Sequence, residues 1–223
     1  MADLDLVGLV RNGTMSPEIA ATLSVAVRER RSFLVFAVPR LAGKSTVMHA
    51  MLAEAPAGTP VRVATGTAEE VHELQRGTGG GYLVIPEISQ APVPSYIWGE
   101  PVRQVFGLLG RGHSLAAALH APGVEEAFEI VCGQNGVTDG EASRIELAVS
   151  LRSLGDWQAP TRRVVDALHE VHGVTRGKPA VRTLYRWDES ADRFVTVVGP
   201  GRIDPEASRR RAEEIGALAL AGA

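Results

Sequence analysis

A short apolar run that leads through a turn into a helix constrains the fold of this chain more than any other feature. Residues 32–38 read Ser-Phe-Leu-Val-Phe-Ala-Val, and the run ends at Pro39. An uninterrupted apolar run of this kind is typical of a strand that is buried on both faces. A turn over residues 39–43 then leads into a helical stretch over residues 44–54. Because both faces of such a strand must be covered, we expect a sheet with helices on each side.

The following part of the chain repeats this alternation of strands and helices. Apolar segments predict strands over residues 60–64, 82–85 and 114–120. A short polar helix is expected over residues 67–75, and further helices over residues 99–109 and 123–132. The segment at 114–120 suits a helix or a strand by propensity, and its flanking Gly112 and Pro122 favour the strand. Strands that alternate with helices at this spacing predict a mostly parallel core sheet.

The pattern changes after residue 140. Residues 145–152 alternate apolar and polar side chains, which predicts a half-exposed strand. Further strands are expected over residues 162–171, 182–187 and 193–198, the last two joined as a hairpin, and Asp204-Pro205 begins a terminal helix. We therefore predict an α/β fold with added antiparallel strands near the C-terminus.

Length and composition limit the class of protein. We expect residues 1–31 to be a lead-in with a helix that begins after Ser16, and residues 32–223 to form one domain with a sizeable core. The net charge of −3 and the pI of about 6.1 argue against a nucleic-acid partner. The single cysteine, Cys132, cannot form an internal disulfide, and the first residues lack the basic flank and apolar run of a signal peptide. These features favour a cytoplasmic protein.

The turn after the first strand carries the residues of a phosphate-binding loop. Gly43-Lys44-Ser45-Thr46 stands between a strand and a helix, the context in which backbone N–H groups and a helix N-terminus hold an anion. Lys44 is one of only two lysines in the chain. The predicted phosphate-binding residues are Pro39, Arg40, Leu41, Ala42, Gly43, Lys44, Ser45 and Thr46, with the Ser45 hydroxyl as a ligand for Mg²⁺ and the Lys44 ammonium facing solvent.

This loop departs from the common pattern G-x-x-x-x-G-K-[ST]. Val38 stands at the first glycine, and Leu41 stands where many such loops have another. A non-glycine residue held at positive φ costs on the order of 1 kcal/mol. A chance Gly-Lys-Ser at the start of a helix is the alternative interpretation.

Three further side chains are candidates for the same site. Glu87 ends an apolar strand about forty residues after the loop, where a P-loop fold has the group that orients the attacking water. His113 and His120 flank the strand predicted at 114–120, and their odd separation excludes a simple metal pair. The alternatives are a solvated glutamate and, for each histidine, a nucleotide sensor or a structural side chain.

Taken in order, these segments resemble a known family. The resemblance extends over roughly residues 7–200 and rests on Leu9-Val10 with Met15-Ser16-Pro17-Glu18, Gly43-Lys44-Ser45-Thr46, Leu83-Val84-Ile85-Pro86-Glu87-Ile88, Gly112-His113, Leu119-His120-Ala121, Arg162-Arg163-Val164-Val165, Glu170-Val171 with Gly173, and Leu184-Tyr185-Arg186-Trp187-Asp188. The order and spacing are similar to those of the C-terminal motor domain of the type II/type IV secretion ATPases, especially the branch that drives tight-adherence pili and archaeal surface filaments.

The resemblance implies a RecA-like P-loop NTPase that binds ATP and Mg²⁺ through Lys44, Ser45 and Thr46. It makes Glu87 the Walker B glutamate, and His113 and His120 the histidines of the family's His box. It also implies a hexameric ring of identical subunits that works with a pilus or secretion platform protein at the inner face of the membrane, coupling ATP hydrolysis to filament assembly or secretion.

The same resemblance leaves a second interpretation open. The arginine that usually follows the Walker B glutamate is absent from Pro86-Glu87-Ile88-Ser89, and the acidic box has only Glu69 and Glu70 as weak candidates. A non-catalytic structural or regulatory subunit that keeps the fold without turnover is therefore the alternative.

Overall fold

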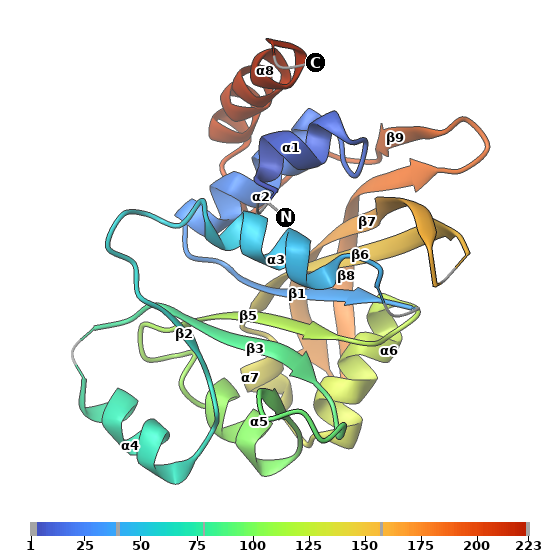
Figure 1. Cartoon of the computed structure of the whole chain (residues 1–223). Helices are drawn as coiled ribbons and strands as arrows, with labels where there is room; N and C mark the ends of the chain where they lie inside the picture. Colours follow the sequence, from blue (N-terminus) through green and yellow to red (C-terminus); the bar gives the residue numbers. More distant parts are fainter. Residues whose placement is uncertain (1–3, 39–40, 78, 157, 222–223) are drawn as a thin grey trace.

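The computed structural model describes residues 4–38, 41–77, 79–156 and 158–221. Within them, a nine-stranded sheet is packed between helices (Figure 1). The strands are β1 (Ser32–Ala37), β2 (Val61–Val63), β3 (Tyr82–Ile88), β4 (Tyr96–Ile97), β5 (Ser114–Leu119), β6 (Ile145–Gly155), β7 (Pro160–Thr175), β8 (Lys178–Asp188) and β9 (Arg193–Thr196). The helices are α1 (Leu6–Arg11), α2 (Pro17–Arg28), α3 (Lys44–Leu52), α4 (Ala68–Arg76), α5 (Glu100–Phe106), α6 (Val124–Phe128), the π-helix η1 (Glu129–Gln134), α7 (Asp139–Ala142) and α8 (Pro205–Ala221).

The strand order is β2-β3-β5-β1-β6-β7-β8-β9, and β4 pairs with β3 outside this path. All pairs from β2 to β6 are parallel, and the pairs from β6 to β9 are antiparallel. The predicted α/β fold, with a mostly parallel core sheet and added antiparallel strands, is confirmed. Strand β5 lies between β1 and β3, so the carboxyl ends of these three strands meet at one edge of the sheet.

Each face of the sheet has its own hydrophobic core. Successive side chains of β1 point to opposite faces: Phe33 and Val35 pack with α1, α2 and α3, whereas Leu34 and Phe36 pack with α5 and α6. Figure 1 shows α1, α2, α3 and α8 on one side of the sheet, with α5, α6 and α7 on the other. The predicted covering of both faces is therefore confirmed, and the N-terminal helices share one core with the sheet.

Two helix starts follow directly from local sequence. The Ser16 hydroxyl accepts a hydrogen bond from the backbone N–H of Ile19 at 3.4 Å, and Pro17 occupies the first turn of α2. The Asp204 carboxylate accepts hydrogen bonds from the backbone N–H groups of Glu206 and Ala207 at the start of α8. Both predicted starts are confirmed.

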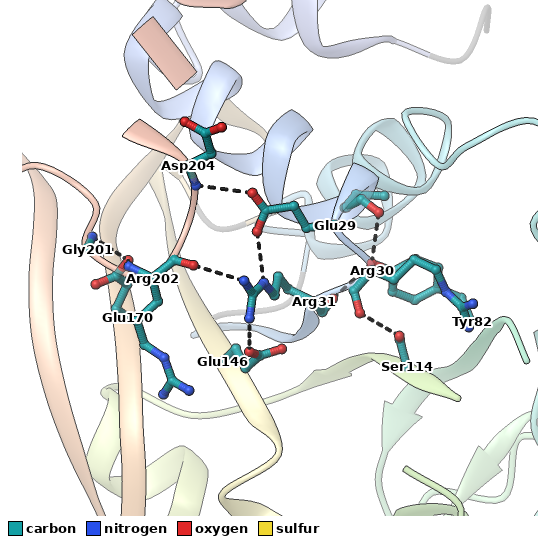
Figure 2. A network of polar contacts seen from close by, with 11 residues as sticks. Glu29, Arg30, Arg31, Tyr82, Ser114, Glu146, Glu170, Gly201, Arg202 and Asp204 are labelled. Atoms are coloured by element: carbon teal, nitrogen blue, oxygen red, sulfur yellow. Dashed lines mark hydrogen bonds and ion pairs between the residues drawn. The ribbon is translucent and has the colours of Figure 1, made fainter. Parts of the chain in front are cut away.

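A polar network fixes the segment that leads into α8 (Figure 2). The Arg31 guanidinium pairs with Glu29 and Glu146, at 2.9 and 2.6 Å, and donates to the carbonyl of Arg202 at 2.9 Å. Glu170 is fully buried on β7, and its Oε1 accepts the backbone N–H groups of Gly201 and Arg202 at 2.8 Å each. The chain is thereby held beside the start of β1 before α8 turns back over α2.

Three elements differ from the sequence-based expectations. Strand β3 continues past Ile85 to Ile88, because β4 pairs with it at Glu87 and Ile88, and Pro86 falls where its pairing with β5 is irregular. Strand β6 is mostly buried rather than half exposed, because Ala148 packs in the core on the α5 side. Helix α6 ends at Phe128 and continues as the π-helix η1.

Candidate functional site

The loop between β1 and α3 forms one wall of the candidate site. Gly43 caps α3 with φ of +92° and ψ of 14°, a left-handed conformation that glycine adopts without strain. Among the described residues, no side chain caps this helix start, so its first N–H groups can accept an anion as partner. Ser45 and Thr46, in the first turn, are exposed. Pro39 and Arg40, two of the predicted loop residues, lie outside the described residues.

Leu41 has the strained backbone that the sequence suggested. Its φ is +67°, and its side chain is 60% exposed. Because the left-handed region costs a leucine on the order of 1 kcal/mol, contacts elsewhere must hold the loop in this shape. Ala42, the next residue, is buried and anchors the loop to the core.

The structure brings Lys44, Glu87 and His120 together at the carboxyl ends of the strands. The Lys44 Nζ lies 3.3 Å from Glu87 Oε2 and 3.1 Å from His120 Nε2. Glu87 belongs to β3, and His120 follows β5 directly. The sequence therefore identified three residues that the fold gathers into one cluster of a cation, a carboxylate and an imidazole.

Burial sets the electrostatics of this cluster. Lys44 is only 8% exposed and Glu87 only 5%, so the expectation that the Lys44 ammonium faces solvent is wrong. The side chain instead lies against the carboxylate of β3, because in the described sheet β1 and β3 are separated by one strand, β5. Charges this deeply buried depend on each other for compensation.

One oxygen of Glu87 has no hydrogen-bond partner among the described residues. Glu87 Oε1 is buried, and it lies 3.9 Å from His120 Nε2, beyond hydrogen-bond distance. An unsatisfied buried carboxylate oxygen is costly unless a water or a ligand donates to it. Among the described residues, the cluster therefore keeps one carboxylate oxygen without a donor.

His113 does not join this cluster. It precedes β5, whereas His120 follows it, and a strand of this length separates them by roughly 20 Å. His113 is 7% exposed, and burial lowers its pKa. A backbone contact with Leu74 acts in the opposite direction but is outweighed by burial together with the charges of Arg30 and Arg62. These surroundings favour the neutral form of His113, which lies at the amino end of β5, away from the cluster at the carboxyl ends of the strands.

Arg163 is the residue at the loop to which sequence analysis gave no role. It lies on β7, and its Nε donates a hydrogen bond to the carbonyl of Leu41 at 2.6 Å. A Cβ on Gly43 would be 3.0 Å from its Cδ. The Arg162-Arg163 pair is visible in the sequence, but only the order β1-β6-β7 brings one of the two onto the loop.

The described residues contain no cluster of three or more His, Cys, Asp or Glu side chains that could hold a metal ion. His169 and His172, which resemble a zinc-binding pair, lie on β7 instead of a helix. The His169 Nδ1 lies 3.0 Å from the Thr183 hydroxyl, and burial lowers the pKa of His169.

Comparison with known proteins gives structural matches only. No family model and no curated protein matches the chain. The VirB11 ATPase of the Brucella suis type IV secretion system, in complex with sulphate, matches with a TM-score of 0.51 at 15% identity, over 74% of this chain and 56% of that one. The Legionella pneumophila ATPase DotB matches with a TM-score of 0.42 at 12% identity, over 86% of this chain and 53% of that one, which is too weak to support an argument.

The chain thus spans about half the length of each of these structures. At this identity, the similarity to VirB11 shows the fold alone: a mixed α/β domain with a mostly parallel sheet and flanking helices. Among the described residues, no helix is both long and apolar enough to cross a bilayer.

Proposed function

We propose that this chain is an ATP-binding P-loop domain of the RecA-like kind, acting as a motor-type subunit of a secretion or pilus system. The observation that carries the proposal is the cluster of Lys44, Glu87 and His120 beside the uncapped start of α3. Parallel α/β sheets bind ligands at the carboxyl ends of their strands. The strand order supports this proposal, because β5 alone separates β1 from β3 in the described sheet. The start of α3, the Lys44 ammonium and the Glu87 carboxylate therefore lie close together.

The residues of the loop fit a nucleotide with its Mg²⁺. The N–H groups at the start of α3 and the Lys44 ammonium would hold phosphate oxygens, and the exposed hydroxyl of Ser45 would be a ligand to the ion. Mg²⁺ needs few protein ligands when phosphate oxygens and waters complete its shell, which fits a site without a cluster of metal-binding side chains. When bound, the ion neutralises charge on the phosphates.

In this proposal, Glu87 orients the attacking water. Its unpartnered Oε1 accepts a hydrogen bond from that water, while its Oε2 contacts Lys44 before the nucleotide arrives. Triphosphate binding then draws Lys44 towards the phosphates, where the ammonium stabilises charge in the transition state. His120, at the end of β5, is placed to respond to this movement.

The proposed assembly is a homo-oligomeric ring, most simply a hexamer, at the cytoplasmic face of a membrane and in contact with a platform protein. The family resemblance of the sequence supports this assembly. VirB11, whose fold is similar, is described as an ATPase of a type IV secretion system and was solved with sulphate, an anion that resembles a phosphate group in shape and charge.

A non-catalytic subunit is the second candidate, and a specific observation favours it. Lys44 and Glu87 already compensate each other in a buried ion pair, and Leu41 holds the loop at positive φ. A phosphate ligand must compete with Glu87 for Lys44, and it must bind to a loop whose shape includes the left-handed backbone of Leu41. Such a subunit would keep the fold and the assembly contacts without turnover.

Replacement of Lys44 tests the proposed function. We expect Lys44→Met to abolish ATP binding measured by calorimetry, whereas Lys178→Met, which removes the other, exposed lysine, leaves the affinity unchanged. Because Lys44→Met strands the buried Glu87 carboxylate, the double variant Lys44→Met with Glu87→Gln serves as the well-folded comparison, and its thermal unfolding is recorded. Equal ATP affinity in this double variant and the wild type contradicts the proposal.

Turnover separates the two candidates. Phosphate release that grows with protein concentration supports a motor, since a ring would bring subunits together. A rate equal to that of the Lys44 variant at every concentration, with ATP still bound by the wild type, supports the non-catalytic subunit.

A further inference from the structure

The Arg163 guanidinium lies against the backbone of the phosphate-binding loop. Its Nε donates to the carbonyl of Leu41 at 2.6 Å, and its Cδ occupies the space beside Gly43, the cap of α3. The contact spans a long stretch of sequence and is possible because β7 follows β6, which pairs with β1. Arg163 is therefore carried to the loop by the sheet and not by a neighbouring segment of chain.

The two terminal nitrogens of the Arg163 guanidinium have no polar partner among the described residues. The side chain is exposed, and among the described residues no hydrogen bond or ion pair involves its Nη1 or Nη2. The preceding residue is different: Arg162 Nη1 pairs with Asp192 at 2.7 Å, and its Nε and Nη2 donate to the carbonyl of Gly13. Arg162 is therefore paired with a carboxylate, whereas Arg163 reaches the loop with two terminal nitrogens that can still donate to a ligand.

Arg163 lies close to the amino end of α3. A helix N-terminus carries partial positive charge, so a cation beside Gly43 is repelled by the start of α3. The Lys44 ammonium adds a second positive group, and the Glu87 carboxylate is already paired with it. The helix start, Lys44 and Arg163 thus bring positive charge to one loop, which favours a ligand with several negative charges.

We propose that Arg163 is a phosphate-contacting residue, supplied by the chain itself, that makes this site select nucleoside di- and triphosphates over monophosphates. The inference rests on the proposed function. Nε stays on the Leu41 carbonyl and keeps the loop in shape, while Nη1 and Nη2 donate to phosphate oxygens. A planar guanidinium with parallel N–H groups suits this geometry better than an ammonium does.

The decisive variant is Arg163→Gln. The glutamine side-chain nitrogen stands at the same position along the side chain as the arginine Nε, so it retains a donor for the Leu41 carbonyl but lacks the charge and the terminal nitrogens. Arg163→Ala removes all of these. Arg162→Gln is the matched control, because it removes an adjacent arginine that is already paired with Asp192.

Calorimetric titration with ATP, ADP and AMP, with Mg²⁺ present, gives the readout. We expect Arg163→Gln to weaken ATP and ADP binding at least tenfold, to change AMP binding by less than threefold, and to leave the midpoint of thermal unfolding unchanged. We expect Arg162→Gln to bind all three nucleotides as the wild type does. The wild-type preference for ATP over AMP should also fall as the salt concentration rises, since salt screens exposed charges.

Two results overturn the inference while leaving the proposed function intact. In the first, ATP binding is lost in Lys44→Met but is unchanged in both Arg163 variants. In the second, Arg163→Gln binds as the wild type does and only Arg163→Ala is weakened, which reduces Arg163 to a support for the loop. A wild-type protein that binds none of the nucleotides overturns the proposed function and this inference together.

Discussion

At the scale of single residues, the candidate site is dominated by a buried ion pair that a ligand must open. Lys44 and Glu87 are each less than a tenth exposed, and their charged atoms are 3.3 Å apart. Removing one member of such a pair leaves the other as an uncompensated buried charge, which costs about 3–5 kcal/mol. The pair therefore competes with phosphate for the lysine.

The variant Glu87→Gln tests whether Glu87 competes with phosphate for Lys44. It keeps the shape of the side chain but removes the charge that holds Lys44, so we expect ATP to bind several-fold more tightly. We also expect any turnover to disappear, because a water-orienting carboxylate acts mainly in the transition state. Calorimetry and phosphate release on the same preparation measure both quantities.

Glu213→Gln, which replaces an exposed glutamate on α8, is the matched control and should change neither quantity. Weaker ATP binding in Glu87→Gln, in a protein that still unfolds at the wild-type temperature, would contradict the competition between Glu87 and phosphate.

At the scale of elements, a polar cluster joins α8 to the helices beneath it. The Glu54 carboxylate follows α3 and accepts hydrogen bonds from Ser24 and Arg28 of α2 and from Arg211 of α8. Burial works to raise the pKa of Glu54, but the Ser24 hydrogen bond and the Arg211 and Arg28 charges outweigh it, so the pKa is lowered. Arg211, one of three consecutive arginines, thus has a structural contact at the helix interface.

We expect Arg211→Ala to lower the free energy of unfolding by about 1–3 kcal/mol, the range for a hydrogen bond to a charged group. Arg209→Ala, at an exposed position of the same helix, should change it by less than about 0.5 kcal/mol. Urea unfolding at pH 7 measures both. Because the folded-state pKa of Glu54 is lowered, its contribution is present above the unfolded pKa and is lost as the pH falls through the folded one. The difference between wild type and Arg211→Ala should therefore shrink in acid.

At the scale of the whole molecule, we expect stability to depend on pH through two histidines, the buried His113 and the half-buried His169. His113 stands at the amino end of β5 and His169 within β7, on separate strands of the sheet, and burial lowers the pKa of both. The unfolded chain therefore binds protons at a pH where the folded chain does not. Since the unfolded pKa of histidine is about 6.5, the free energy of unfolding must fall as the pH drops below that value.

We expect this slope between about pH 6.5 and 5 to become shallower in His113→Leu, by up to about 1.4 kcal/mol per pH unit, the limit for one proton. The comparison uses slopes, so a general change in stability caused by the substitution does not affect it. His72→Leu, at an exposed position on α4, controls for the loss of one histidine. An unchanged slope in His113→Leu would show that His113 does not take up a proton on unfolding in this window.

Sequence by itself determined the features that depend on neighbouring residues. The apolar run of β1, the helix starts at Ser16 and Asp204 and the Gly43-Lys44-Ser45-Thr46 turn were all readable, because strand burial, capping and glycine conformation are local properties. The strained backbone at Leu41 was readable for the same reason. The mostly parallel sheet followed from the alternation of strands and helices.

Only the tertiary structure decided which of these residues meet. The order β3-β5-β1-β6-β7 brings Glu87 and His120 to Lys44, carries Arg163 onto the loop and leaves His113 at the opposite edge. It also buries Lys44, which the sequence placed in solvent, and Ala148, which alternation assigned to an exposed face. Strand order depends on how both hydrophobic cores pack against the sheet, and that packing joins residues that no local pattern connects.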